Sequence, residues 1–132
     1  MVAFQLFLLK CIKNKEIIFY GKYFQDFYLK VNDQAKEKIG YVFRVIKSVD
    51  KVSEKFLKHI EGTEGLYEIR VQVGSNIYRI FCCFDKKNLV ILFNAFQKKA
   101  QKTPKQEIEL AERLKKKYFT LQARKNEKGR SN

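Results

Sequence analysis

Residues 67–96 read YEIRVQVGSNIYRIFCCFDKKNLVILFNAF, and this stretch carries the most regular pattern in the sequence. In Tyr67–Val73 apolar and polar side chains alternate, which is typical of a strand with one buried face. Gly74-Ser75 is a two-residue hairpin signal, and two nearly continuous apolar runs, Asn76–Phe84 and Asn88–Phe96, follow it. Three strands joined by short turns predict an antiparallel meander.

The first turn brings two arginines together. With two residues between the first two strands, Arg70 lies directly opposite Arg79. Like charges across a strand pair repel one another at a cost of roughly a few tenths of a kcal/mol or more, and a bound anion would offset that cost. The alternative is a solvated face on which Arg79 pairs with Glu68.

The second turn sets the rest of the register. If it consists of Lys86-Lys87, Arg79 also faces Asn94, on the face that continues to Phe96 and Lys98. A change of one residue in a loop would undo this register, and a three-residue loop with a bulge would restore it. The far end of the arginine face is expected to be apolar, with Phe81, Cys83, Val90 and Leu92. The opposite face is expected to pack against helices and collects Tyr67, Ile69, Val71, Val73, Tyr78, Ile80, Cys82, Phe84, Leu89, Ile91, Phe93 and Ala95.

The chain before the meander predicts one short strand and two helices. A strand is expected over Ile17–Tyr20, and Tyr23–Leu29 predicts a short helix with Phe24 and Phe27 inward. Asn32-Asp33 is a break and an N-cap for the second helix. Its apolar positions recur at helical spacing: Ala35, Ile39, Val42, Ile46 and Val49.

The segment after the meander predicts a C-terminal helix. Thr103 and Gln106 form a capping box with Pro104 at the first helical position. The apolar stripe of this helix is Ile108, Ala111, Leu114, Tyr118 and Leu121.

These elements predict one domain of the α+β class, in which an antiparallel meander packs against an N-terminal helical pair and a C-terminal helix follows. The domain is expected over residues 15–121. Residues 1–14 form an N-terminal extension, and residues 122–132 resemble a solvated basic tail. Lys51–Gly65, between the second helix and the meander, is less regular.

Composition narrows the function. The 132 residues include 28 Lys and Arg against 14 Asp and Glu, a net charge of +14, which points to a polyanionic partner such as RNA, DNA, anionic lipid or an acidic protein. A single histidine excludes metal sites and proton relays that need two imidazoles. Lipid is the least favoured partner, because no amphipathic segment pairs a basic face with a free apolar one.

The cysteines and the N-terminal run indicate the compartment. Cys11, Cys82 and Cys83 are odd in number and lack CxxC spacing, so they support neither a disulfide framework nor a zinc site. Val2–Leu9 is too short to span a membrane and lacks the flanks of a signal peptide. We expect a reduced, cytoplasmic protein without cofactor or metal.

A cationic cluster without paired carboxylates suits one reaction, the in-line attack of an RNA 2′-hydroxyl on the neighbouring phosphate. Guanidinium groups bind phosphate bidentately, so Arg70 and Arg79 are candidates to hold it. Lysine among cations can exchange protons near neutral pH, which suits Lys98 or Lys99. His59 is a possible general base, and the alternative is a loop histidine that only packs or is solvated. Among the aromatic residues of the strands, Phe96 shares the arginine face, while Tyr67 and Tyr78 are expected in the core.

Three stretches, EGTEGLYEIRV at 61–71, NIYRIF at 76–81 and FQKKAQKTP at 96–104, resemble a known family. In this order, L-Y-E-x-R, a hairpin, Y-R-x-F and F-x-K-K-x-x-K-T-P is similar to the phage-derived, HigB-like branch of the RelE/ParE toxin superfamily. The resemblance runs from about Glu16 to Phe119.

The resemblance implies a RelE-like fold and the toxin of a type II toxin–antitoxin pair, whose antitoxin is expected to be a helix-turn-helix protein. RelE and HigB relatives cleave mRNA in the ribosomal A site by the 2′-hydroxyl route. By position, Arg70 and Arg79 match the family's strand basics, and Lys98 and Lys99 match the basic residues after the last strand. Glu68 stands where RelE has a second lysine, so the acid or base is not carried over, and Glu68 itself becomes a candidate.

Asn94, Phe96, Lys102 and Lys105 are the expected RNA-binding residues around this centre, with the last helix following the RNA backbone. Two other functions stay open. ParE relatives share the fold but inhibit DNA gyrase and lack the nuclease residues, and a non-catalytic RNA-binding module would need only the basic surface.

Overall fold

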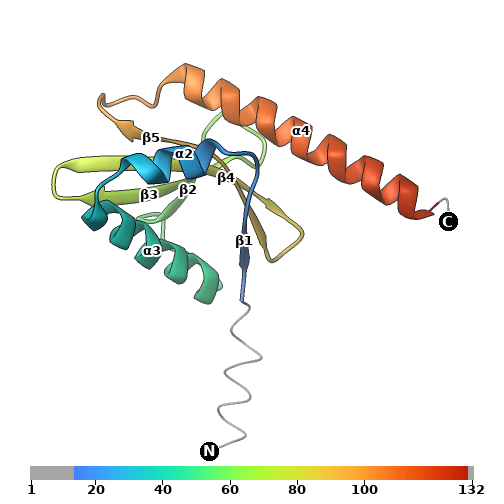
Figure 1. The fold of residues 1–132 in the computed structure, drawn as a ribbon, viewed down its shortest axis with the longest axis horizontal. Coiled ribbons are helices and arrows are strands. Elements are labelled where there is room, and N and C mark those ends of the chain that lie inside the picture. The colour runs from blue at the N-terminus through green and yellow to red at the C-terminus, as the bar shows by residue number, and fades with distance from the viewer. Residues whose placement is uncertain (1–13, 131–132) are drawn as a thin grey trace, which may run out of the picture.

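A computed structural model describes residues 14–130 and shows an α+β domain, as predicted (Figure 1). Its single sheet has the strand order β1-β5-β4-β3-β2, with β1 parallel to β5 and the other neighbours antiparallel. The predicted extension lies outside the described residues up to position 13, and Val2–Leu9 and Cys11 lie outside with it. The elements are β1 (Glu16–Phe19), α2 (Tyr23–Lys30), α3 (Asp33–Ser48), β2 (Leu57–His59), β3 (Tyr67–Val73), β4 (Asn76–Asp85), β5 (Leu89–Lys98) and α4 (Lys105–Arg130).

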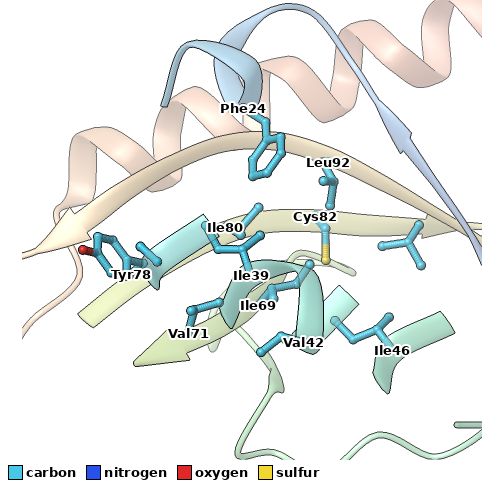
Figure 2. Packing of buried hydrophobic residues seen from close by; sticks show 12 residues of the cluster. Phe24, Ile39, Val42, Ile46, Ile69, Val71, Tyr78, Ile80, Cys82 and Leu92 are labelled. Carbon is cyan, nitrogen blue, oxygen red and sulfur yellow. The ribbon is translucent and has the colours of Figure 1, made fainter. Parts of the chain in front are cut away.

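Helices α2 and α3 cover one face of the sheet. Phe24 of α2 is buried there, and the side chain of Asn32 caps α3 by accepting a hydrogen bond from the Ala35 N–H at 2.9 Å. The predicted stripe of α3 is buried except for Val49, which follows the last helical residue and is exposed. Figure 2 shows this core, in which the helix residues meet side chains of the three long strands: Ile69, Val71, Tyr78, Ile80, Cys82, Val90 and Leu92.

Helix α4 packs on the opposite face and builds a second core, so the sheet is covered on both sides (Figure 1). Ala111, Leu114 and Tyr118 of α4 are buried, as the predicted stripe requires, whereas Leu121 is exposed. The strand residues of this second core are Phe81, Cys83, Ile91 and Phe93.

The register of β3 against β4 is as predicted, and that of β4 against β5 is not. Arg70 pairs with Arg79, but Arg79 pairs with Phe96 and not with Asn94. The turn after Asp85 has three residues rather than two, so Asp85 pairs with Leu89. Near this turn the faces of β5 are therefore exchanged: Leu89, Ile91 and Phe93 lie toward α4, and Val90 and Leu92 lie toward α2 and α3.

A β-bulge between Ile80 and Cys82 restores the alternation further along the strands. Ala95 packs toward α2 and α3, as predicted, and Phe96 lies on the face of Arg79. A three-residue turn followed by a bulge is the combination that keeps the arginine face in place.

Two further elements differ from the sequence-based expectation. The irregular stretch after α3 contains a three-residue strand, β2, which pairs with the start of β3. Helix α4 begins at Lys105, one residue after Pro104, and continues to Arg130, so residues 122–130 are helical and not a tail without folded structure. Gln, Ala, Arg, Lys and Glu dominate this segment and favour helix, which explains why the helix extends beyond the sheet (Figure 1).

Candidate nucleic-acid-binding site

One row of side chains crosses the three middle strands on the sheet face that α4 packs against. Arg70 of β3, Arg79 of β4 and Phe96 of β5 are successive cross-strand partners and so share one face. Phe96 packs edge-on against the ring of Phe81, with ring centroids 5.4 Å apart. Lys98 lies two residues beyond Phe96 on the same face, opposite Ile77, and is half-buried.

The carboxylate of Glu68 lies between the two guanidinium groups. Its oxygens are 3.7 Å from Nε of Arg70 and 3.5 Å from Nε of Arg79. The pairing of Arg79 with Glu68, expected for a purely structural face, is therefore present, and the same carboxylate also serves Arg70. One carboxylate facing two guanidiniums leaves an excess of positive charge at this point.

Arg79 is the more deeply placed of the two arginines, with 7% of its side chain exposed against 33% for Arg70. Burial lowers the pKa of Arg79, Glu68 raises it, and the neighbouring Arg70 lowers it. Among the described residues, neither Nε has a hydrogen-bond acceptor, while Nη1 of Arg79 donates to the Tyr78 carbonyl and Nη1 of Arg70 to that of Glu54. A buried guanidinium stays charged and favours an anion beside it.

A cleft of about 480 Å³ opens beside this row. It lies where the pairing of β2 with β3 ends at Ile69, so that within residues 14–130 the edge of β3 has no strand partner from Val71 onward. The described residues that line it include four cations and no acid: Lys38, Lys55, Phe56, Arg70, Val71, Gln72, Gly74 and Arg79.

Lys38 and Lys55 are site residues that sequence reasoning missed. Lys38 comes from α3 and Lys55 from the irregular stretch before β2, far from the arginines in sequence. In the sequence Lys38 is one of several polar positions on α3, and only the packing of α3 against β3 brings it to the cleft.

Asn94 was predicted to bind RNA, but in the structure it is not free to do so. It is buried, and its Nδ2 donates to the carbonyl of Glu107 at 3.0 Å and to Glu107 Oε2 at 2.7 Å. The bulge turns Asn94 toward the first turn of α4, where it anchors the helix to the sheet.

The other basic residues predicted for the site lie at the end of β5 and beyond it. Lys99 follows the strand directly and is exposed, Lys102 is exposed in the connection to α4, and Lys105 is the exposed first residue of the helix. They extend the positive charge from the strand end to the start of α4 and do not line the cleft.

His59 lies on the opposite face from the arginines. It pairs across the strands with Tyr67, their rings 5.3 Å apart, and Tyr67 packs in the core under α2 and α3. The His59 Nε2 is 2.9 Å from the carbonyl oxygen of Thr63. The structure therefore does not bring this candidate base to Arg70 and Arg79, and it is Lys58 that pairs across the strands with Glu68.

Within residues 14–130, no group of three or more His, Cys, Asp and Glu side chains is arranged to hold a metal ion. Cys82 and Cys83 are free thiols, buried in the two separate cores. None of the helices in the described part of the chain is long and apolar enough to cross a membrane.

The sequence was also compared with known proteins. No curated protein matches it significantly. The family model described as "Phage derived protein Gp49-like (DUF891)" matches residues 26–116, which include both arginines and both cleft lysines. The chain therefore belongs to the Gp49-like family of phage-derived proteins, a toxin-like family related to the RelE-type toxins.

Proposed function

We propose that this protein is the HigB-like toxin of a type II toxin–antitoxin pair and that it cleaves mRNA on the ribosome, which stops translation and arrests growth. Family membership supports a toxin with an antitoxin as its partner. The observation that supports a nuclease is the pairing of Arg70 with Arg79 beside a cleft lined by four cations.

The reaction that fits this surface is a transesterification within the RNA. The 2′-oxygen forms a bond to the adjacent phosphorus, the bond to the 5′-oxygen breaks, and the products carry a 2′,3′-cyclic phosphate and a 5′-hydroxyl. Arg70 and Arg79 would hold the scissile phosphate and stabilise the charge that develops on its oxygens. The reaction needs no metal ion because the nucleophile is supplied by the RNA itself.

Two proton transfers complete the step. The 2′-hydroxyl must lose a proton, and the leaving 5′-oxygen must gain one. Glu68, whose carboxylate faces both guanidiniums, and Lys98, further along the same face, are our candidates for these two transfers, with Lys99, the residue after Lys98, as a further candidate. Lys102 and Lys105 would attract the RNA backbone from the start of α4.

The test is expression of the toxin with and without its neighbouring gene, followed by transcriptome-wide mapping of mRNA 5′ ends. We expect growth arrest and new ends within codons when the toxin is expressed alone, and neither when the antitoxin is present. Arg79→Lys should abolish or strongly reduce cleavage, because lysine cannot bind phosphate bidentately. Arg70→Ala should have the same effect, because alanine cannot bind phosphate with its side chain. Lys87→Ala, at an exposed position in the turn between β4 and β5 at the other end of β4 from Arg79, is the control and should cleave normally.

Other outcomes would identify the alternatives. Intact transcripts together with gyrase-dependent DNA breaks would contradict the nuclease and indicate ParE-like action. Salt-sensitive ribosome binding without any cleavage would indicate an RNA-binding module. Full toxicity of the Arg79 variant at equal expression would remove Arg79 from the mechanism.

A further inference from the structure

Next to the arginine cleft, two lysines and two aromatic rings form a continuous line across the junction of α3 and the segment before β2. The Nζ of Lys38 lies 5.0 Å from the ring centroid of Tyr41, and Tyr41 meets Phe56 edge-on at 6.2 Å. The Nζ of Lys55 in turn lies 5.5 Å from the ring of Phe56. We call Lys38, Tyr41, Lys55 and Phe56 the aromatic ledge.

The ledge joins the arginine cleft to a second hollow on the surface of α3. Lys38, Lys55 and Phe56 line the arginine cleft. Lys38 and Tyr41 also line a neighbouring cleft of about 550 Å³, together with Gln34, Glu37, Arg44, Gln72 and Val73. Gln72, on the edge strand β3, also lines both clefts, so the two clefts adjoin one another between Arg79 and α3.

Tyr41 is not among the buried core residues of α3. It lies outside the buried stripe of α3, and 45% of it is exposed, in contrast to the fully buried Val42 beside it. A large aromatic side chain that is exposed between lysines offers a flat apolar surface next to positive charge. Surfaces of this kind bind single-stranded nucleic acid, because bases stack on the rings while the cations attract the phosphates.

We propose that the aromatic ledge is a subsite for single-stranded RNA, in which an unpaired base stacks on Tyr41 while Lys38 and Lys55 bind the phosphates that flank the scissile one. The assignment rests on the proposed function, because that function makes RNA the ligand of the adjacent arginines. It adds a binding surface on α3 that is separate from the strand-end lysines and from α4.

The test is equilibrium binding of the full-length protein to a fluorescent RNA of about twelve nucleotides, long enough to cover both clefts. Every ribose of this probe carries a 2′-O-methyl group, so the probe cannot be cut and the measurement does not depend on catalysis. Tyr41→Ala should weaken binding about 5- to 100-fold, and Tyr41→Phe, which keeps the ring, should bind like the unmodified protein.

Matched controls separate the ledge from general effects. Tyr23→Ala removes a tyrosine of similar exposure on α2, which lines neither cleft, and should leave affinity unchanged. Lys38→Ala and Lys55→Ala should each reduce the slope of log affinity against log salt by about 0.7, whereas Lys47→Ala, elsewhere on α3, should not. Thermal melting shows that each variant is folded.

Equal affinities of the Tyr41→Ala and Tyr23→Ala variants would overturn the proposal, and so would a failure of the unmodified protein to bind the probe. Loss of antitoxin binding in Tyr41→Ala at unchanged RNA affinity would also overturn it, because the ledge would then be a protein interface. None of these results depends on whether the protein cleaves mRNA. Conversely, a ledge that binds RNA in a protein without cleavage activity would keep this proposal and remove the nuclease.

Discussion

At the scale of single residues, Glu68 is the acidic partner of both arginines of the site. Its carboxylate faces Nε of both Arg70 and Arg79, and it lies on the same sheet face as they do. The pairing can be explained in two ways, as structural compensation of two buried cations or as a base held beside a phosphate site. Both require the carboxylate, but they differ in what an added anion does.

We expect Glu68→Gln to lower the free energy of unfolding by about 1–3 kcal/mol, because two partly buried guanidiniums lose their counter-charge. Inorganic phosphate should restore part of this loss by binding between the arginines, and it should stabilise the variant more than the unmodified protein. Urea unfolding with and without phosphate measures both effects. Glu61→Gln, which changes an exposed carboxylate before β3, is the control. Equal phosphate effects on all three proteins would show that removing the Glu68 carboxylate does not favour an anion between the arginines.

The two adjacent thiols of β4 are expected to make the folded state less stable at alkaline pH. Burial raises the pKa of Cys83 to about 12, with an opposing effect of Lys115 and a further increase from Asp85. Burial also raises the pKa of Cys82. In the unfolded chain a thiol titrates near pH 8.5, roughly. Because the folded-state pKa is the higher one, the stabilisation is complete below that pH and is lost as the pH rises toward 12.

Cys83→Ala should therefore flatten the alkaline decline in stability by up to about 1.4 kcal/mol per pH unit. The free energy of unfolding is measured in urea at about pH 7, 9 and 10. Val90→Ala, which truncates a buried side chain without a titrating group, should lower stability equally at each pH. A decline in Cys83→Ala as steep as in the unmodified protein would show that this thiol is not the cause.

At the scale of elements, turn length and helix length mark where sequence reasoning succeeds and where it fails. The Gly74-Ser75 turn has two residues, as its sequence indicates, so the pairing of Arg70 with Arg79 was predictable. The length of the turn at Lys86 could not be read from its sequence pattern. Lys86 has a positive φ of 56°, and Asn88 belongs to the turn instead of pairing with Asp85. Helix α4 is longer than its apolar stripe, because helix propensity continues after the stripe ends.

The exposed end of α4 can be tested by ending the chain after Leu121. Residues 122–129 are not buried, so the melting temperature should change by no more than a few degrees. The salt dependence of RNA binding should weaken, because basic residues are removed. A full-length variant with Arg124→Gln and Lys125→Gln should show a smaller change of the same kind. A large loss of stability in the shortened chain would mean that the end of the helix supports the fold.

At the scale of the whole molecule, the basic residues behind the net charge of +14 lie on separate surfaces: the arginine cleft, the segment after β5 and helix α4. The strand arginines and the exposed lysines after β5 could be predicted from residue order, because pairing and strand ends are local properties. Lys38, Lys55 and Tyr41 could not, because their positions depend on how α3 packs against the free edge of β3. Asn94 and His59 were assigned to the site by register and by chemistry, and the bulge and the pairing of β2 place them elsewhere.

If the surface around Arg70 and Arg79 cleaves mRNA through the 2′-hydroxyl, as we propose, the reaction requires the ribose at the cleavage position. Purified protein is added to ribosomes that hold an mRNA in the A site, either unmodified or with a 2′-deoxyribose at the mapped cleavage position. We predict that the unmodified mRNA is cut to a 2′,3′-cyclic phosphate and that the 2′-deoxy mRNA stays intact. Cleavage of the 2′-deoxy mRNA at the same position, or no cleavage of either mRNA, would contradict the account.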